Sequence, residues 1–432
     1  MTNRAEIEKL QPFEARAIIE DLRKGSVPVE YVPFFTVGRQ NWLKFIDEDL
    51  ENYIAEGGAK VRFINGDYGD GKTHFMSIVQ HLARQKGFAV SFVVLTRDVP
   101  IHKFEIVYQT IVRQLCGTFD GVGIRRLVDG WVEGLDLGTK DAVPFDEQLT
   151  ALSELLRALP GMDLNFANAL TSLVDNRFRP LSEGETESDR AQAREVLYLW
   201  FEGVRVSKRE LKPFQVFEAL DKTNNKRFLG SLISFLKHMG YRGLVLLMDE
   251  LETVIAQSAS VRNASYENVR LLIDNAEQAS YLHIFMSIIP DVILSDKGFK
   301  SYDALWSRVR SIGEGKRLNY RSVLIDLHKT PLEMDELIEL GLCLCRIHEL
   351  AYRWDTKNQV GEGLIKKMCE AQKRMGLLSE VRLFIKQVIR VLDMTEQGNA
   401  PDEDADVTEH LVVSQREMEQ EKVEQLQPKW DE

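Results

Sequence analysis

Residues 66–73 have the residue types and the spacing of a phosphate-binding loop. They fit the pattern G-x-x-x-x-G-K-[ST] at every required position. Glycine tolerates positive φ, so the three glycines let the backbone curl and turn its N–H groups towards a polyanion. Lys72 would reach the β- and γ-phosphates of a nucleotide, and the Thr73 hydroxyl would ligate Mg²⁺. The residues predicted to bind nucleotide are Gly66, Asp67, Tyr68, Gly69, Asp70, Gly71, Lys72, Thr73 and His74.

The flanking residues indicate the strand and the helix that such a loop requires. Residues 61–64 are Val-Arg-Phe-Ile, which is typical of a short strand, and residues 74–82 have apolar residues at helical spacing. A glycine-rich turn that arose by chance would lack this context. The sequence therefore predicts strand, phosphate loop and helix in that order, with His74 on the helix beside the site and not as a catalytic base.

Two adjacent acidic residues follow a continuous apolar run at residues 244–248. Such a run is expected of a strand that is buried on both faces of a parallel sheet. It ends in Asp249 and Glu250. Phosphoryl transfer to water needs a carboxylate in the metal shell and a group that orients the water, and we assign Asp249 to Mg²⁺ and Glu250 to the water. An acidic helix start after the strand would give the same residues, but the upstream phosphate loop favours the catalytic interpretation.

Composition indicates a large globular protein without a membrane segment. The 432 residues suggest two to three domains, and 44% hydrophobic residues are enough for a core. The N-terminus lacks the apolar region of a signal peptide, and no apolar run approaches the ~20 residues of a membrane span. We therefore expect a cytoplasmic protein that does not contact a membrane. Residues 401–432 contain eleven acidic and three basic residues, so most of the net charge of −12 lies there.

Alternating strand and helix patterns predict an α/β fold with a three-layer, mainly parallel sheet. Further strands are predicted at 89–95, 283–289 and 322–327, and a helix from about Glu105 to Leu115. The acidic C-terminal segment is predicted to be a disordered tail or a docking segment. The predicted domains are an N-terminal helix and lead-in (1–35), a core (36–330) with a helical insertion (about 120–235), a helical lid (331–398) and the acidic tail (399–432).

The order of these parts resembles an AAA+-like P-loop ATPase module. The resemblance depends on the Val37-Gly38-Arg39 lead-in, the phosphate loop, Asp249-Glu250, a polar residue in the 283–289 strand and a terminal helical lid. The chain is most similar to the ATP-binding P-loop proteins of bacterial phage-exclusion (BREX-type) defence systems, the BrxD-like family. The residues that carry this similarity are Asn65 to His74, Gly87-Phe88-Ala89-Val90 and Leu246 to Glu250, and the likeness extends over about 30–395.

The resemblance implies an ATPase that uses ATP and Mg²⁺ beside a helicase or methyltransferase in defence against foreign DNA. It does not identify the partner, and DNA could be bound directly or through that partner. A nucleotide-gated adaptor that turns over slowly, or not at all, remains an alternative. A kinase-like phosphotransferase with its acceptor site in the insertion is a second one, but the adjacent acids favour attack by water.

The resemblance also implies three further polar positions. Ser287 occupies the place of a sensor residue, although its hydroxyl could instead bond neighbouring backbone. Arg382 fits a lid arginine that contacts the γ-phosphate, or an exposed helix arginine. Arg308 and Arg310 stand where an arginine finger is carried, or face solvent or DNA phosphates. Because no arginine of the same chain is evident near the phosphate loop, we expect a neighbouring subunit to supply one, and hence a homo-oligomer.

Overall fold

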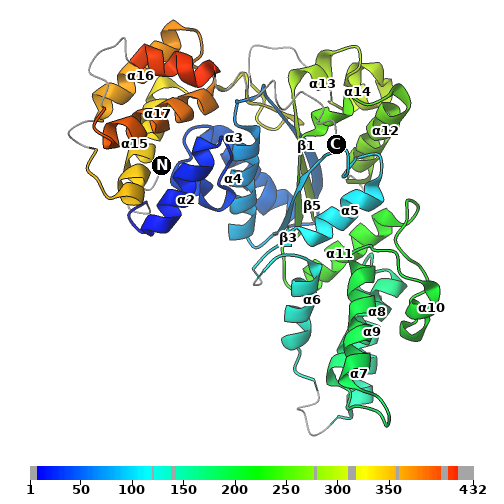
Figure 1. Ribbon diagram of the computed structural model, residues 1–432. Helices are drawn as coiled ribbons and strands as arrows, with labels where there is room; N and C mark the ends of the chain where they lie inside the picture. The colour runs from blue at the N-terminus through cyan, green and yellow to red at the C-terminus, as the bar shows by residue number, and fades with distance from the viewer. Residues whose placement is uncertain are drawn as a thin grey trace, which may run out of the picture. The chain divides into compact units, whose positions relative to one another are not determined.

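The computed structural model describes residues 7–118, 121–137, 143–276, 280–309, 318–356, 360–399 and 407–416. Its sheet has six strands in the order β3-β2-β4-β5-β1-β6 (Figure 1). All five strands predicted from the sequence are present, and a sixth, β3, is added. The strands are β1 (Ala59–Asn65), β2 (Ala89–Val94), β3 (Leu115–Cys116), β4 (Leu244–Asp249), β5 (Leu282–Ile288) and β6 (Leu324–Asp326).

Strand β4 lies between two parallel neighbours. Val245 pairs with Val90 of β2 and with His283 of β5. Every residue of β4 and β5 is buried, as expected of strands covered on both faces by other elements. The prediction of a mainly parallel α/β sheet is therefore confirmed.

Strand β3 corrects the prediction that a helix runs to about Leu115. The helix α5 (Phe104–Arg113) ends earlier, and Leu115 pairs antiparallel with Ser91 of β2. Leu115 is fully buried, and the Cys116 thiol donates to the carbonyl of Val90. Pairing with the edge of β2 thus overrides the local helical pattern.

The chain divides into two compact units. The first comprises Met1–Lys44, Ile64–His81 and Ile325–Glu432, and it holds the phosphate loop. The second comprises Phe45–Phe63 and Leu82–Leu324, and it holds the acidic pair.

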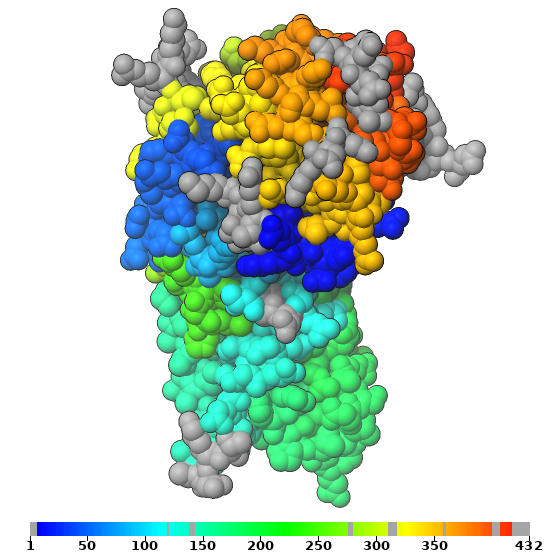
Figure 2. All heavy atoms as spheres, turned by 90° about the vertical axis from the view of Figure 1, so that its left-hand side faces the viewer, coloured from blue at the N-terminus to red at the C-terminus, as the bar shows by residue number. Residues whose placement is uncertain are grey.

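The second unit contains the predicted helical insertion, which forms one continuous block of surface (cyan to green in Figure 2). Its core is aromatic: the ring centroid of Phe166 lies 4.9 Å from that of Phe201 and 6.0 Å from that of Trp200. The helices of the insertion are α6 (Ile124–Glu133), α7 (Phe145–Ala158), α8 (Leu164–Phe178), α9 (Glu187–Phe201) and α10 (Lys208–Leu211). The other helices of this unit include α11 (Asn225–His238), α12 (Ala259–Ala276), α13 (Pro290–Leu294) and α14 (Asp303–Val309).

The first unit combines an N-terminal helix with the predicted lid helices, which lie beside it in Figure 1. Its helices include α2 (Pro12–Arg23), α4 (Lys72–Gln85, whose last residues belong to the second unit), α15 (Met334–Tyr352), α16 (Glu362–Arg374) and α17 (Val381–Glu396). A partly buried polar contact joins three of them: Asp393 of α17 accepts a hydrogen bond from Arg23 of α2 at 2.8 Å and contacts His348 Nε2 of α15 at 3.0 Å.

Part of the segment predicted to be a disordered tail is ordered in this unit. Residues 407–416 form a helix. Val407 and Leu411 are buried in the apolar core that α2, α15, α16 and α17 share, and Gln387 Nε2 donates to the carbonyl of Val407 at 3.1 Å. The prediction of disorder is therefore wrong for this stretch, because its few apolar residues are spaced to reach the core. Most of the remaining tail lies outside the described residues.

No helix among the described residues combines the length and the apolar character needed to cross a membrane.

Buried His283 of β5 gives a testable pH dependence. Its side chain is fully buried, and within the described part of the chain neither ring nitrogen has a hydrogen-bond partner. Burial, with the nearby charges of Arg62 and Lys60, lowers the pKa of His283 well below its ordinary value. The unfolded chain therefore binds the proton first as the pH falls below about 6.5, and stability is lost in that window.

We expect the free energy of unfolding to fall by about 1 kcal/mol between pH 7.5 and pH 5.5 on account of His283. The substitution His283→Leu should remove that part of the loss, as measured by urea unfolding at both pH values. The same substitution at His102 is the control. An unchanged pH dependence in His283→Leu would show that His283 is not its source.

Candidate functional site

The phosphate loop of the first unit has the local structure that its sequence predicts. It begins after β1 and ends where α4 begins, at Lys72. Gly69 and Gly71 have φ of 99° and 83°, a region that side chains other than glycine rarely adopt. A Cβ atom on Gly66 would lie 3.1 Å from Cβ of Asp70, so a larger residue would crowd the turn. The curled backbone and the N-terminus of α4 together form the anion-binding geometry.

Lys72 lies over the loop. Its Nζ donates to the carbonyl oxygens of Gly66 at 2.9 Å and of Asp67 at 3.3 Å, and it lies 5.2 Å from the centroid of the Tyr68 ring. The side chain is buried, while that of Tyr68 is about half exposed. An ammonium group held by backbone carbonyls at this place can bind phosphate oxygens in their stead, so the residues present fit a nucleotide polyphosphate.

The two acidic residues of the loop, Asp67 and Asp70, are linked to each other and to a histidine. Asp70 Oδ2 accepts the backbone N–H of Asp67 at 2.7 Å, which closes the turn. His328 Nδ1 lies 3.3 Å from Asp67 Oδ2 and 3.5 Å from Asp70 Oδ2. His328, in the segment after β6, thus contacts both carboxylates. The sequence analysis did not identify it, because no short motif links residue 328 to the loop.

Arg39 corrects the expectation that no arginine of the same chain lies near the phosphate loop. Its Nη2 donates to the backbone carbonyl of Asp70, and its Nη1 would lie 3.6 Å from a Cβ atom on Gly71. Arg39 itself has a φ of 57°, after Gly38 at 69°. Burial lowers the pKa of Arg39 to about 10 against the opposing charges of Asp70 and Glu336, so the guanidinium remains charged at neutral pH. The Val37-Gly38-Arg39 lead-in was the signal that could have indicated it.

His74 lies on α4 directly after the loop, as predicted. Its Nε2 lies 3.3 Å from Thr36 Oγ1, and its ring centroid lies 5.3 Å from that of Phe35. Burial and the charge of Arg39 lower the pKa of His74 to about 3. The imidazole is therefore neutral at physiological pH, and it contacts Thr36 and Phe35 just before the Val37-Gly38-Arg39 lead-in.

The predicted lid arginine is brought next to the loop. Arg382 lies in the first turn of α17, and its Cβ would be 4.0 Å from a Cβ atom on Gly69. Its guanidinium packs against Gly25. A contact of Arg382 with the γ-phosphate remains a prediction.

The second unit brings together the acidic pair and Ser287. Asp249 is buried at the end of β4, and the Ser287 hydroxyl donates to its Oδ1. The backbone N–H of Glu250 donates to Asp249 Oδ1 at 3.0 Å and to Ser287 Oγ at 2.9 Å. Ser287 therefore contacts the predicted metal ligand Asp249 and also a neighbouring backbone N–H, that of Glu250. The backbone contact was one of the two alternatives for its hydroxyl. Its contact with the attacking water remains a prediction.

Glu250 has an unusual backbone conformation. Its φ is 66°, and it precedes a short 3-10 helix, η4 (Leu251–Val254). A non-glycine residue in the left-handed region costs on the order of 1 kcal/mol, and such strain clusters at functional sites. The two hydrogen bonds that its N–H donates, to Asp249 and Ser287, hold the backbone in this conformation directly after β4.

The predicted finger arginines are only partly described. Arg308 of α14 forms a bidentate ion pair with Asp274 of α12. Its Nε donates to Asp274 Oδ1, and its Nη2 donates to Asp274 Oδ2 at 3.0 Å. Its Nη1 donates to the carbonyl of Ala304. Arg310 lies outside the described residues. The role of both arginines as a finger stays a prediction.

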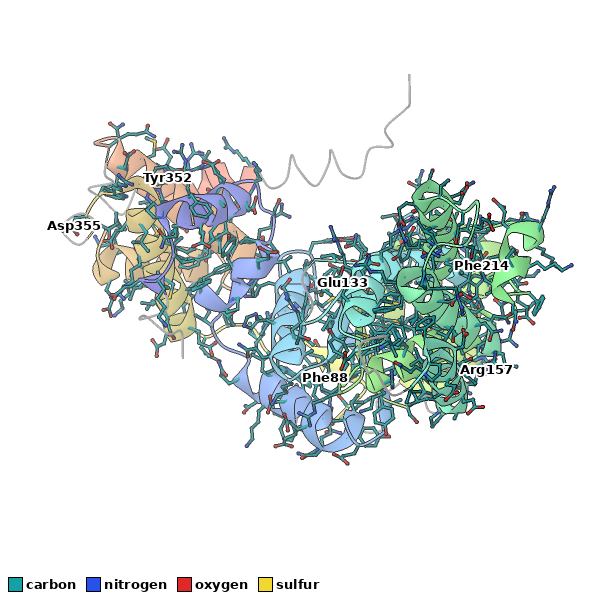
Figure 3. All side chains as sticks on the ribbon, turned by 90° about the horizontal axis from the view of Figure 1, so that it is seen from below. Phe88, Glu133, Arg157, Phe214, Tyr352 and Asp355 are labelled. Carbon is teal, nitrogen blue, oxygen red and sulfur yellow. The ribbon has the colours of Figure 1, made fainter. Side chains whose placement is uncertain are left out.

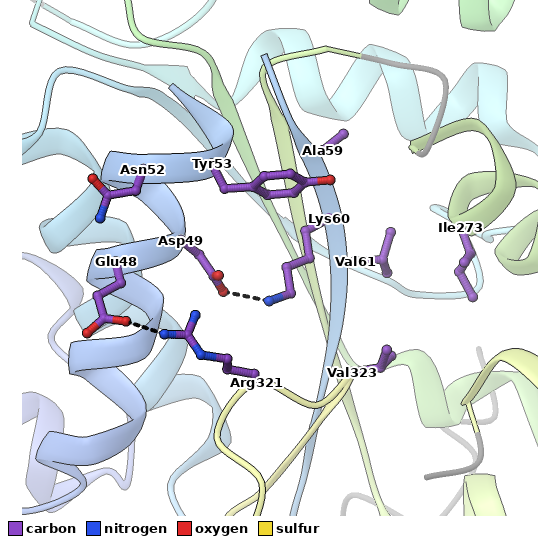
Figure 4. Close-up of a pocket in the computed structure, with 10 residues that line it drawn as sticks. All are labelled: Glu48, Asp49, Asn52, Tyr53, Ala59, Lys60, Val61, Ile273, Arg321 and Val323. Carbon is purple, nitrogen blue, oxygen red and sulfur yellow. Dashed lines mark hydrogen bonds and ion pairs between the residues drawn. The ribbon is translucent and has the colours of Figure 1, made fainter. Parts of the chain in front are cut away.

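A cavity of about 630 Å³ lies elsewhere in the second unit (Figure 4). Its charged lining residues are paired with one another: Lys60 Nζ binds Asp49 at 2.7 Å and Arg321 binds Glu48 at 2.7 Å. Because these charges are internally satisfied, the cavity adds no group to the predicted phosphate chemistry.

Comparison with known proteins supports the sequence-based assignment. No curated protein shows significant similarity to the chain. Among solved structures, the chain is similar to the Walker-type ATPase PABY2304 of Pyrococcus abyssi, with 12% identity over 90% of this chain and 75% of that one, at a TM-score of 0.39. That likeness is too distant to carry an argument. The model of the family "BREX system ATP-binding protein BrxC/D", by contrast, matches residues 10–411, and the chain therefore belongs to this family of ATP-binding proteins.

Proposed function

We propose that the protein binds and hydrolyses ATP, and that its nucleotide state switches a DNA-acting partner in the defence system. The observation that carries this proposal is the phosphate loop, with Lys72 held over a backbone cradle at the N-terminus of α4. Family membership supports ATP as the nucleotide. A helicase or a methyltransferase is the proposed partner.

Each group at the two site regions has a proposed task. Lys72 exchanges its carbonyl partners for phosphate oxygens, and Arg39 adds a second positive charge beside Gly71. Thr73 and Asp249 would hold Mg²⁺, which offsets the negative charge that develops on the transferred phosphoryl group. Glu250 orients the attacking water.

Ser287 acts on this chemistry through Asp249. Its hydroxyl donates to Asp249 Oδ1 and accepts the N–H of Glu250, so it fixes both acids relative to each other. A carboxylate that already accepts hydrogen bonds is held in one orientation, which is the requirement for a metal ligand.

A nucleotide-gated adaptor with slow turnover is the second candidate. The observation that favours it is the ion pair of Arg308 with Asp274. Of the two predicted finger arginines, Arg308 is the one within the described residues, and its guanidinium is already bound to a carboxylate of the same chain. Steady-state phosphate release with and without DNA separates the two. Turnover that DNA or a partner stimulates supports the switching ATPase, and binding of ATP without release of phosphate under all these conditions supports the adaptor.

We expect an arginine supplied in trans to make the specific activity rise with protein concentration. Arg310→Ala or Arg308→Ala should then lower kcat at least tenfold with little change in ATP affinity, since a finger acts on transition-state charge. Light scattering with ATP should show self-association.

Asp274→Asn is the matched control for Arg308. It breaks the ion pair but leaves the arginine, so it should preserve turnover if Arg308 acts as a finger. Equal losses in Asp274→Asn and Arg308→Ala would assign Arg308 to the packing of α14 on α12. A monomer that turns over at a concentration-independent rate would contradict the trans-arginine model.

A further inference from the structure

Residues 205–227 of the insertion, which we call the basic segment, carry the opposite charge to the protein as a whole. The chain has a net charge of −12, but this segment has seven basic residues against three acidic ones. The segment includes α10, the short 3-10 helix η3 (Lys212–Phe214) and the start of α11. Its basic side chains are all exposed: Arg205, Lys208, Arg209, Lys212, Lys222, Lys226 and Arg227.

The three acidic residues of the basic segment are occupied by local contacts. Glu210 accepts the N–H and the hydroxyl of Ser207 in the cap of α10. Asp221 accepts from Thr223 and Asn224 in the turn before α11. Glu218 pairs with Arg227, which also binds Asp163 at 2.9 Å.

The other six basic side chains consequently have no carboxylate within ion-pair distance in the described part of the chain. Six cations without a paired carboxylate on one short surface segment attract a polyanion, although the net negative charge of the whole protein repels it. A surface that only kept the protein soluble would not need to concentrate this charge.

An exposed aromatic side chain lies in the middle of the basic segment. Phe217 is 60% exposed, whereas its neighbour Val216 is fully buried. The backbone on either side is fixed: the N–H of Phe217 donates to Asn165 Oδ1 at 2.8 Å, and Trp200 Nε1 donates to the carbonyl of Glu218 at 2.7 Å.

A further hydrogen bond, from Asn168 Nδ2 to the carbonyl of Gln215 at 2.8 Å, ties the turn to α8. Gln215 has a φ of 55°, and the preceding Phe214 of η3 is half-buried (Figure 3). Phe217 is thus held outward by a rigid turn. Leu164, which precedes the residue that binds the Phe217 N–H, is also exposed.

We propose that the basic segment binds single-stranded nucleic acid, with phosphates on its lysines and arginines and a base stacked on Phe217. Unpaired bases offer π-faces to an aromatic side chain, and a duplex does not. A membrane surface is disfavoured because α10 is too short to present an amphipathic face. The proposal goes beyond ATP binding and does not depend on it.

The test is fluorescence anisotropy of the full chain with a fluorescein-labelled oligothymidylate of about twenty nucleotides, long enough for one binding site. With about four phosphate contacts, affinity should fall roughly 50-fold between 50 and 200 mM salt. Phe217→Ala should weaken binding about 5- to 100-fold, and Phe217→Leu nearly as much, because leucine has no π-face. Lys208→Ala/Lys212→Ala should make the salt slope shallower by about 1.4.

The matched control is Lys9→Ala/Lys24→Ala, which removes the same charge from exposed lysines of the other unit and should bind like the parent. Absence of saturable binding, or equal effects of the two lysine pairs, would overturn the proposal. Equal affinity for a duplex that Phe217→Ala does not change would overturn it as well, as would preferential binding of polyglutamate, which would indicate an acidic protein partner. ATP binding measured on the same samples shows whether the nucleotide site is intact independently of this result.

Discussion

Lys72→Ala is expected to lower the affinity for ATP by roughly 10- to 100-fold. The substitution removes a charge-assisted hydrogen bond to the phosphates, worth about 1.5–3 kcal/mol. In the structure, Lys72 Nζ donates to two loop carbonyls, 2.9 Å from Gly66 O and 3.3 Å from Asp67 O. The loop conformation does not depend on Lys72 alone, because Asp70 Oδ2 also accepts the backbone N–H of Asp67 at 2.7 Å, so we expect the fold to remain intact.

Titration with a fluorescent ATP analogue measures this effect, and thermal melting checks the fold. Lys329→Ala is the control, because it removes the same charge from an exposed lysine in the same unit. Equal affinity for ATP in Lys72→Ala and the parent would contradict the interpretation of residues 66–73 as a phosphate loop. A matching loss in Lys329→Ala would show that net charge, and not the loop, determines the affinity.

Glu250→Gln is expected to retain ATP binding and to lose at least 100-fold in kcat. The side chain is assigned to orient the attacking water, and a positioned side chain of this kind contributes about 10²–10⁴-fold in enzymes that use one as a base. The backbone should be unaffected, because the N–H of Glu250 makes the bonds to Asp249 and Ser287 and the amide keeps the side-chain shape. The variant should therefore accumulate the ATP-bound state.

Substitutions of Asp249 are expected to affect ATP binding and stability in a different way. Asp249→Ala should weaken the Mg²⁺-dependent part of ATP binding. It also leaves the Ser287 hydroxyl and the Glu250 N–H without their shared acceptor, which costs about 1–3 kcal/mol of stability in a buried site. Asp249→Asn keeps an acceptor oxygen, so it separates the loss of the metal ligand from the loss of the hydrogen bonds.

Single-turnover and steady-state phosphate release distinguish these variants, with Glu252→Gln as the control for a neighbouring acid in η4. Hydrolysis by Glu250→Gln at the parental rate would remove Glu250 from the catalytic role and favour the adaptor. A melting temperature that falls in Asp249→Ala but not in Asp249→Asn would confirm the structural part of the role of Asp249.

The sequence by itself determined the elements whose signals are local. The phosphate loop is contiguous, so its glycines, Lys72 and the start of α4 follow from one short motif and its flanks. The core strands are also local, since continuous apolar runs predict burial on both faces. Asp249 and Glu250 were found because they end such a run.

The tertiary structure alone decided which distant residues meet. Arg39 contacts Asp70 although many residues separate them, and His328 reaches the same loop from the segment after β6. Ser287 was expected to have a partner, but only the pairing of β4 with β5 could identify it as Asp249. No spacing rule encodes these contacts, because each one depends on how separate elements pack.

The same reason explains the remaining corrections. Leu115 continues a helical pattern but lies in β3, because an edge of the sheet is available to it. Residues 407–416 belong to a segment whose acidic charge predicted disorder, yet Val407 and Leu411 are buried in a core built by α2, α15, α16 and α17. Burial of a few apolar side chains at about 25 cal/mol per Å² can fix a segment whose local propensity is neutral, and that gain exists only once the core has formed.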